Sequence, residues 1–234
     1  MAVKPVETRR LYLQIADKLR ALIDQQQLAP NARLPSEREL AQTLGVSRPS
    51  VREALVALEL EGRVEIRMGS GVYICAAPDS ATRAGPHETE FGESPLEIMT
   101  ARSVIEGAIA ASVAPFAKPK ALRALRDIYT TMSQEVSAGQ VPIAADRAFH
   151  LAIAKMSGND LLLRTVANLF DERHSPLSSK LRGHFEGEGT WAAALGEHGD
   201  ILDALEARDS IQAQAMMQRH LKASYERLMS RRKG

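Results

Sequence analysis

The sequence predicts a mainly α-helical protein of two domains, the first of which also carries a short β-hairpin. Three observations lead to this prediction. Residues 1–75 contain three helix patterns and then an alternating pair of strands, residues 76–93 have no apolar periodicity, and residues 94–234 contain helix signals and almost nothing that favours strands. The chain of 234 residues also exceeds the ~150 residues of an average domain, which agrees with two domains.

The composition is that of an ordinary globular protein, with 44% hydrophobic and 25% charged residues. A formal net charge of +1 argues against a strongly basic coating protein and against an acidic disordered chain. A single cysteine, Cys75, excludes an internal disulfide and a multi-cysteine metal site. Because no apolar run approaches the ~20 residues of a membrane span and the first ten residues lack an apolar stretch, we expect a cytoplasmic protein with no membrane partner.

The first domain, residues 1–75, is expected to contain three helices. The first spans about residues 8–26, where apolar residues recur at helical spacing: Leu11, Ile15, Leu19 and Leu22. Ser36 and Glu39 form a capping box that starts the second helix, which runs through Leu44 and ends at Gly45. Ser47 caps the third helix and Pro49 is tolerated in its first turn. An inner apolar stripe then continues to the stop at Gly62: Val51, Leu55 and Leu58.

A β-hairpin is expected to follow these helices. Residues 64–67 alternate between apolar and polar, residues 68–71 read Met-Gly-Ser-Gly as a turn, and residues 72–74 return as the second strand. Two helices joined by the short turn at residues 44–46, followed by this hairpin, make a winged helix-turn-helix. Such a fold places its second helix in the DNA major groove, with the N-terminal residues of that helix facing the base edges.

The residues predicted to read DNA lie at the start of the third helix and around it. Arg48 and Arg52 are four residues apart and therefore share one face, from which an arginine can donate two hydrogen bonds to guanine. Arg38, early in the second helix, could reach the same groove or a phosphate. Gly69 and Gly71 would let the wing backbone approach the duplex closely. The alternative for any one of these arginines is an ordinary solvated side chain.

Residues 76–93 are rich in proline, glycine and small polar residues, and we interpret them as a linker. An all-α bundle of six or seven helices is expected over residues 94–234. Its helices should begin near Ser94, Pro119, Pro142, Asn159 or Asp160, Thr190 and Asp209, with a break at residues 175–176.

A possible metal site lies within this second domain. Asp146 and His150 are four residues apart on one helix face, beside apolar neighbours. His198 and His220 lie in later helices, also among apolar residues. Buried carboxylates and imidazoles are costly unless they are paired or metal-bound, and three imidazoles with one carboxylate suit Zn²⁺, Ni²⁺ or Mn²⁺. The spacing alone establishes only the Asp146–His150 pair, and each histidine could instead be an ordinary hydrogen-bonded one.

The first domain resembles the GntR family of bacterial transcription regulators. The resemblance rests on four motifs: Leu34-Pro35-Ser36-Glu37-Arg38-Glu39-Leu40-Ala41, Gly45-Val46-Ser47-Arg48, Val51-Arg52-Glu53-Ala54-Leu55, and Leu58-Glu59 with Gly62. It implies a dimeric, winged helix-turn-helix regulator with a separate effector domain. It also implies that the positions contacting DNA are Arg38, Arg48, Arg52 and Gly69, with Ser47 and Pro49 at neighbouring contact positions. Pro49 has no side-chain donor for reading a base.

The second domain resembles the FCD effector domain of the FadR-like subgroup, which serves effector binding and dimerisation. The motifs are Arg102-Ser103-Val104-Ile105-Glu106, Asp146-Arg147-Ala148-Phe149-His150, residues 197–205, and Gln218-Arg219-His220-Leu221. In metal-binding members of this subgroup, one aspartate and three histidines within these motifs hold a divalent cation. The resemblance therefore implies the ligands Asp146, His150, His198 and His220, with Zn²⁺ favoured and Ni²⁺ or Mn²⁺ as alternatives. Such a site leaves positions open for the carboxylate of a small organic acid.

Three further residues are candidates for binding that acid. Arg102 could pair with its carboxylate, or it could form an intrahelical pair with Glu106. Arg173 and His174 precede the expected helix break and could contact sugar hydroxyls. The stretches around Arg9–Tyr12, Arg173–Pro176 and Thr190–Trp191 look like those of regulators of hexuronate and related sugar-acid catabolism, so we expect a sugar acid as the effector.

The resulting hypothesis is a DNA-binding transcription regulator, a repressor rather than an enzyme. It would bind a pseudo-palindromic double-stranded operator as a homodimer, because two-fold protein symmetry matches a two-fold site. Three alternatives stay open. The cation itself could be the signal, the Asp-His₃ site could belong to a metalloenzyme, or the chain could be an architectural DNA-binding protein.

Overall fold

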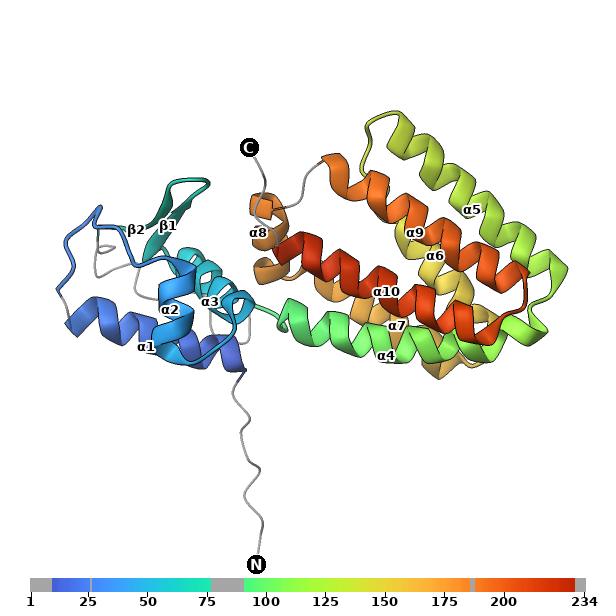
Figure 1. Cartoon of the computed structure of the whole chain (residues 1–234), viewed down its shortest axis with the longest axis horizontal. Helices are drawn as coiled ribbons and strands as arrows, with labels where there is room; N and C mark the ends of the chain where they lie inside the picture. The colour runs from blue at the N-terminus through green and yellow to red at the C-terminus, as the bar shows by residue number, and fades with distance from the viewer. Residues whose placement is uncertain (1–9, 26, 77–90, 186–187, 230–234) are drawn as a thin grey trace, which may run out of the picture. The chain divides into compact units, whose positions relative to one another are not determined.

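The computed structural model describes residues 10–25, 27–76, 91–185 and 188–229 (Figure 1). The ends of the first predicted helix, most of the predicted linker and the last residues of the final predicted helix lie outside these ranges. The chain forms two compact units. One comprises the chain up to Ser94 together with His174–His184, and the other comprises Pro95–Arg173 with Phe185–Lys233.

The first unit contains the predicted three helices and hairpin in the predicted order. Its elements are α1 (Leu11–Gln25), α2 (Glu37–Leu44), α3 (Arg48–Leu60), β1 (Val64–Arg67) and β2 (Gly71–Ile74). Local hydrogen bonds explain where α2 and α3 begin. Ser36 and Glu39 form the reciprocal capping box, and the Ser47 hydroxyl accepts a hydrogen bond from the Ser50 amide. Gly45 ends α2 at a φ of +67°, a conformation that glycine adopts without strain.

The apolar faces of these elements meet in one core. The two strands pair antiparallel, with Val64 opposite Ile74 and Arg67 opposite Gly71. The inward-facing side chains are almost fully buried and are contributed by all three helices and both strands, among them Ile15, Leu19, Leu40, Val51, Leu55, Leu58, Val64 and Ile74. Each aliphatic side chain buried in this way contributes roughly 1.5–3 kcal/mol of transfer free energy, which holds α3 and the wing in a defined relation.

Two further segments belong to the first unit, and the sequence did not predict their packing there. Pro176 was expected only to break a helix, but it opens α8 (Pro176–Phe185), because a proline is tolerated in the first turn of a helix. Residues 91–93, expected to be linker, include a Phe91 side chain that is only 1% exposed. The two compact units therefore do not meet at one point of the sequence only, whereas the predicted domains were separated by the single linker at residues 76–93.

The second unit is all-helical. With α8, the described part of the chain after residue 94 contains seven α-helices, within the predicted six or seven. The elements are α4 (Pro95–Val113), the 3₁₀ turn η3 (Ala114–Phe116), α5 (Pro119–Ser137), α6 (Ile143–Met156), α7 (Asp160–Asp171), the 3₁₀ turn η4 (Glu172–His174), α9 (Glu188–Glu206) and α10 (Ser210–Met229).

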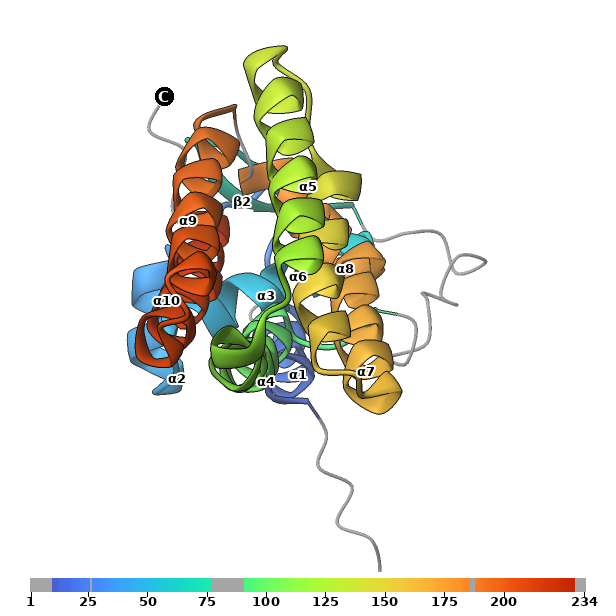
Figure 2. The ribbon, with the colours of Figure 1, turned by 90° about the vertical axis from the view of Figure 1, so that its right-hand side faces the viewer.

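Six of these helices, drawn in Figure 2, pack on one another in a cyclic order that we call the helical ring, and α4 also packs on α6. Going round the ring, α4 packs on α10, α10 on α9, α9 on α5, α5 on α6, α6 on α7, and α7 on α4. The ring encloses one apolar core that includes Leu125, Met132, Phe149, Ile201 and Met217. Within the described residues, no helix is both long and apolar enough to cross a bilayer. The interior of the ring also holds the polar side chains of the candidate site.

Candidate metal centre and DNA-reading helix

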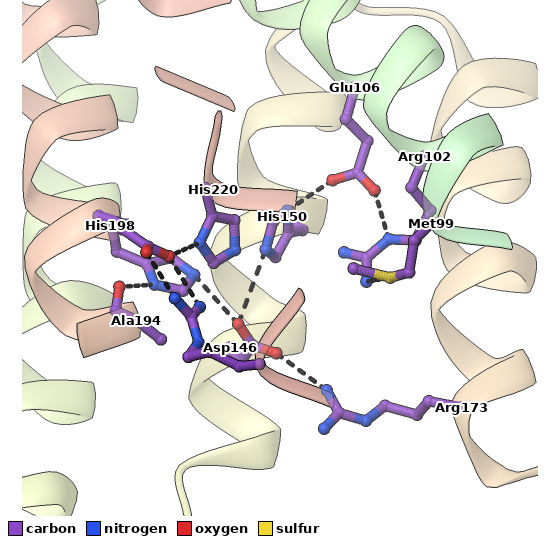
Figure 3. Close-up of polar contacts among 11 residues, drawn as sticks. Met99, Arg102, Glu106, Asp146, His150, Arg173, Ala194, His198 and His220 are labelled. Carbon is purple, nitrogen blue, oxygen red and sulfur yellow. Dashed lines mark hydrogen bonds and ion pairs between the residues drawn. The ribbon is translucent and has the colours of Figure 1, made fainter. Parts of the chain in front are cut away.

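Four potential metal ligands meet inside the helical ring. Asp146 and His150 lie on α6, His198 on α9 and His220 on α10, and one ligand atom from each lies within 4.8 Å of all the others. Each of the four residues is at most 6% exposed. Figure 3 shows the three imidazoles and the carboxylate turned toward a common point. The three histidines and the aspartate predicted as a set are thus brought together, although they come from three helices.

The three imidazoles are oriented by acceptors on their Nδ1 atoms. His150 Nδ1 lies 2.5 Å from Glu106 Oε2, His198 Nδ1 lies 2.7 Å from the Ala194 carbonyl, and His220 Nδ1 lies 2.9 Å from Glu197 Oε2. Carboxylates and carbonyls only accept, so each Nδ1 carries a proton, and a ring that is neutral presents its Nε2 lone pair. Hydrogen bonds of this kind fix the tautomer and the ring orientation of metal-binding histidines.

The two carboxylate oxygens of Asp146, the fourth candidate ligand, contact different groups. Asp146 Oδ1 lies 3.0 Å from His198 Nε2 and 3.6 Å from His150 Nε2. Asp146 Oδ2 accepts a hydrogen bond from Arg173 Nη1 at 3.0 Å. The Nε2 atoms of His150 and His198 are buried without a hydrogen-bond partner. Buried nitrogens in this state are costly unless a ligand completes them, so three nitrogens and one oxygen fit a borderline divalent cation.

The charges around the site shift the pKa values of its ligands in different directions. Burial and the neighbouring His198 lower the pKa of His220 to about 3, which leaves the ring neutral near pH 7. Burial by itself would raise the pKa of Asp146, but the neighbouring His150 and His198 imidazoles hold it well below its ordinary value. For His150, burial opposes the charged form, yet the Glu106 carboxylate and Asp146 raise its pKa.

Two carboxylates that the sequence did not assign to the site orient its histidines, the buried Glu106 and the partly buried Glu197. Burial would raise the pKa of Glu106, but Arg102 and His150 lower it to about 2. The pKa of Glu197 is likewise lowered to about 2, against its burial, by hydrogen bonds from His220 and Arg227. Glu106 lies four residues after Arg102 and Glu197 directly precedes His198, but neither spacing reveals which histidine each carboxylate orients.

The three predicted effector-binding residues are placed differently. Arg102 Nε donates to Glu106 Oε1 at 2.6 Å, so the intrahelical pair left open by the sequence is formed. Its Nη2 remains buried without a hydrogen-bond partner, as do Arg173 Nε and Trp191 Nε1. Both guanidinium groups lie over the Phe170 ring, at 4.8 Å for Arg102 and 5.1 Å for Arg173. His174 lies at the end of η4, and the structure does not bring it to the ligand cluster.

The predicted DNA-facing residues divide into exposed and buried groups. Arg38, Ser47 and Gly69 lie at the surface of the first unit, Pro49 is not fully buried, and the Arg48 side chain is 55% exposed. Gly69 has a φ of +76°, and a Cβ atom added to it would have no described heavy atom within 4 Å, which leaves the wing tip open to a close approach. Arg52 differs, because its side chain is only 4% exposed and is paired with Glu37.

Comparison with known proteins gives this architecture its context. Residues 11–74 match the family described as "Bacterial regulatory proteins, gntR family", and residues 97–223 match "FCD domain". The Uxu operon transcriptional regulator of Escherichia coli (strain K12) is 32% identical over 94% of this chain and 88% of its own length. The putative L-lactate dehydrogenase operon regulatory protein of the same organism is 34% identical, over 91% and 84%.

A solved structure, that of E. coli McbR/YncC, covers 94% of this chain and 97% of its own with a TM-score of 0.51 at 22% identity, which supports the fold alone. The winged helix-turn-helix with a separate helical domain defines a class of DNA-binding transcription regulators. Within this class the chain belongs to the GntR family, and its second domain is an FCD domain.

Proposed function

We propose that the protein is a repressor whose hold on its operator is released by a small organic acid bound at a metal ion in the helical domain. The observation that carries this proposal is the buried Asp146–His150–His198–His220 cluster, in which every imidazole is anchored through Nδ1. A structural role in the core would not require two buried Nε2 atoms to lack hydrogen-bond partners.

The cation is best supported as Zn²⁺, with Ni²⁺ or Mn²⁺ as alternatives. Imidazole nitrogens with one carboxylate oxygen are a donor set that all three accept, and zinc is the ion most often held by such sets. The metal would supply a Lewis-acidic point to which the carboxylate of an acid can bind. Asp146 would contribute Oδ1 while Arg173 holds Oδ2, so the same aspartate links the cation to the surrounding polar groups.

The acid should be rich in hydrogen-bond acceptors. The buried groups around the cluster that lack partners are donors: Arg102 Nη2, Arg173 Nε and Trp191 Nε1. A carboxylate with a neighbouring hydroxyl meets this requirement, and lactate and the sugar acids share that group. We favour a sugar acid (a hexuronate, aldonate or aldarate). The relatives named for the Uxu operon and an L-lactate dehydrogenase operon support an organic acid of this type.

The response to the acid follows from the two-unit architecture. A homodimer would place two winged units on a pseudo-palindromic operator, and ligand binding would favour one arrangement of the helical domain. The acid can shift DNA affinity only by binding the two arrangements differently. A regulator of this kind acts on DNA, so a cytoplasmic location is part of the proposal.

The test combines metal analysis, ligand screening and DNA binding on the full chain. An operator is first selected from random duplexes with the purified protein. Sugar acids and L-lactate are then screened by thermal shift with and without Zn²⁺, because a ligand of the native state raises the midpoint. The expected result is stoichiometric metal, a rise with one acid that requires the metal, and weaker operator binding in its presence. Operator binding that is unchanged or tighter at saturating acid would overturn release by the acid.

The same experiment separates the alternatives. If the cation is the signal, DNA affinity will follow a chelator titration and no acid will add to the effect. An enzyme would turn over a candidate acid, but Glu197, a carboxylate beside the cluster that could serve as a general base, is already bound to His220 and Arg227. An architectural DNA-binding protein would need no buried ligand cluster, and neither metal nor acid would change its binding.

A further inference from the structure

Helix α8 is attached at its start to the segment just before α4. The Leu177 amide donates to the Phe91 carbonyl at 3.0 Å. Gly92 has a φ of +90°, and a Cβ atom there would lie 2.2 Å from the Ser175 Cβ, so only glycine allows this approach. Leu177 and Leu181, four residues apart on one face of α8, are both fully buried. The helix is thus a packed element of the first unit, although it lies within the part of the sequence that matches the FCD domain.

The segment that receives α8 is itself tied to α1 and α3. The Tyr12 hydroxyl donates to the Gly92 carbonyl at 2.8 Å, and Arg10 is paired with Glu93. The buried Ser94 hydroxyl donates to Glu53 Oε2 at 2.7 Å, and Glu53 lies in the middle of α3. Residues 91–94 therefore form a strap between the DNA-reading helix and the start of α8.

Toward its other end, α8 is connected to the wing through the carboxylate of Glu59. Glu59, near the end of α3, accepts a hydrogen bond from the Ile66 amide of β1 through Oε1 at 2.9 Å. Its Oε2 lies 2.6 Å from His184 Nε2 and 3.6 Å from Lys180 Nζ, both on α8. The Glu59 side chain is 9% exposed, which makes these contacts stronger than surface ion pairs. One oxygen of Glu59 thus holds the wing and the other holds α8.

The chain that leads into α8 comes directly from the candidate metal centre. Arg173, the residue before His174, donates to Asp146 Oδ2 at 3.0 Å and lies over the Phe170 and Trp191 rings. Any ligand that changes the position of Asp146 or competes for Arg173 therefore acts on the residue that is joined by a peptide bond to the α8 segment.

We propose that α8 is the output arm of the effector domain, which means that it transmits ligand binding to the first unit. Glu59 is the positioning residue through which α8 determines the conformation of the wing. The part of this proposal that concerns the metal centre rests on the proposed function, whereas the part that concerns Glu59 and the wing does not. The Glu59 bridge makes the conformation of β1 depend on where α8 lies, without any change in the residues that face DNA.

The first test measures amide hydrogen exchange in the full chain. His184→Ala removes the shorter of the two contacts between α8 and Glu59 and leaves only the longer one with Lys180, and Gly92→Ala blocks the packing of α8 at its other end. Both should accelerate exchange at the Ile66 amide by about tenfold, with faster exchange across residues 177–185 and no change in α5, α6 or α9. Gly139→Ala is the matched control, since Gly139 has a φ of +71° but open space around it. Unchanged exchange at Ile66 in both variants would overturn the role of Glu59.

The second test uses Zn²⁺ alone as the probe. In the wild-type chain, loading with Zn²⁺ after chelator treatment should alter exchange in α8 and at Ile66 together. In His184→Ala, Zn²⁺ should bind with the same stoichiometry and alter α8, but Ile66 should no longer respond. If Zn²⁺ binds the wild type and leaves α8 and Ile66 unchanged, the output-arm proposal fails. If no Zn²⁺ binds at all, the proposed function fails, and the first test still decides the role of Glu59.

Discussion

Arg52 and Glu37 form a two-point ion pair inside the first unit. Arg52 Nε lies 2.8 Å from Glu37 Oε1, and Arg52 Nη2 lies 2.5 Å from Glu37 Oε2. Arg48, four residues earlier on the same helix, is 3.8 Å from the same carboxylate but keeps a largely exposed side chain. The two arginines predicted to read DNA together are therefore in different states in the free protein, because one is available and the other links α2 to α3.

This difference predicts distinct effects of the two alanine substitutions. Arg48→Ala should weaken operator binding by about tenfold or more, since a bidentate contact to guanine is worth about 1–3 kcal/mol, and should leave the thermal midpoint unchanged. Arg52→Ala should also destabilise the first unit by about 1–3 kcal/mol, because it removes a buried arginine and leaves the partly buried Glu37 carboxylate with only the more distant Arg48 nearby. Fluorescence anisotropy and chemical denaturation measure the two effects. Equal stability of the two variants would contradict this assignment.

Removal of one metal-binding side chain should abolish the response to the effector while leaving DNA binding in place. His198→Ala deletes a nitrogen from the cluster and should abolish stoichiometric Zn²⁺ binding, together with any response to an acid. Operator affinity without effector should stay close to that of the wild type, because the substitution lies in the other unit. Metal analysis of the purified variant decides the point. Full metal content in His198→Ala would mean that the site has been assigned incorrectly.

Glu106 should increase the metal affinity of the site although it is not one of the proposed metal ligands. Glu106→Gln removes the carboxylate that orients His150 through Nδ1, and loss of such a partner typically costs about 10–100-fold in metal affinity. Glu206→Gln is a suitable control, because Glu206 pairs with Arg126 at the surface of the same unit. Competition with a zinc indicator measures both variants. Equal Zn²⁺ affinity in the two would show that Glu106 serves packing alone.

The pKa values of the histidines predict how a falling pH changes the stability of the metal-free protein. Because burial and His198 lower the pKa of His220 from 6.5 to about 3, the unfolded state binds more protons than the folded state between these values. The contribution of His220 to stability is therefore lost as the pH falls from 6.5 toward 3. His150 acts in the opposite sense, since its pKa is raised, so its contribution is present below 6.5 and is lost as the pH rises through the raised pKa.

The measurement is the thermal midpoint of the chelator-treated chain from about pH 7 to about pH 4, a range that spans most of the His220 titration window. The midpoint of the helical unit should fall with pH in the wild type and should fall less steeply in His220→Gln, which has no imidazole to protonate. A decline of the same slope in both proteins would assign the acid sensitivity to other groups, such as the paired carboxylates.

The sequence alone determined the features that depend on neighbours along the chain. The capping box of Ser36 and Glu39, the cap at Ser47 and the proline that opens α5 act within one turn of helix. The Asp146–His150 pair is also local, because residues four apart share a helix face. These signals predicted the order and type of the elements, and one half of the ligand set, without any tertiary information.

Tertiary structure decided the features that depend on contacts between distant residues. His198 and His220 join Asp146 only because the helical ring brings side chains of α6, α9 and α10 together in its interior, and no spacing encodes the acceptors on their Nδ1 atoms. Glu37 captures Arg52 from 15 residues away, and Glu59 meets His184 from 125 residues away. Long-range pairs of this kind form when packing brings two side chains within hydrogen-bond distance, and a one-dimensional pattern carries no record of that event.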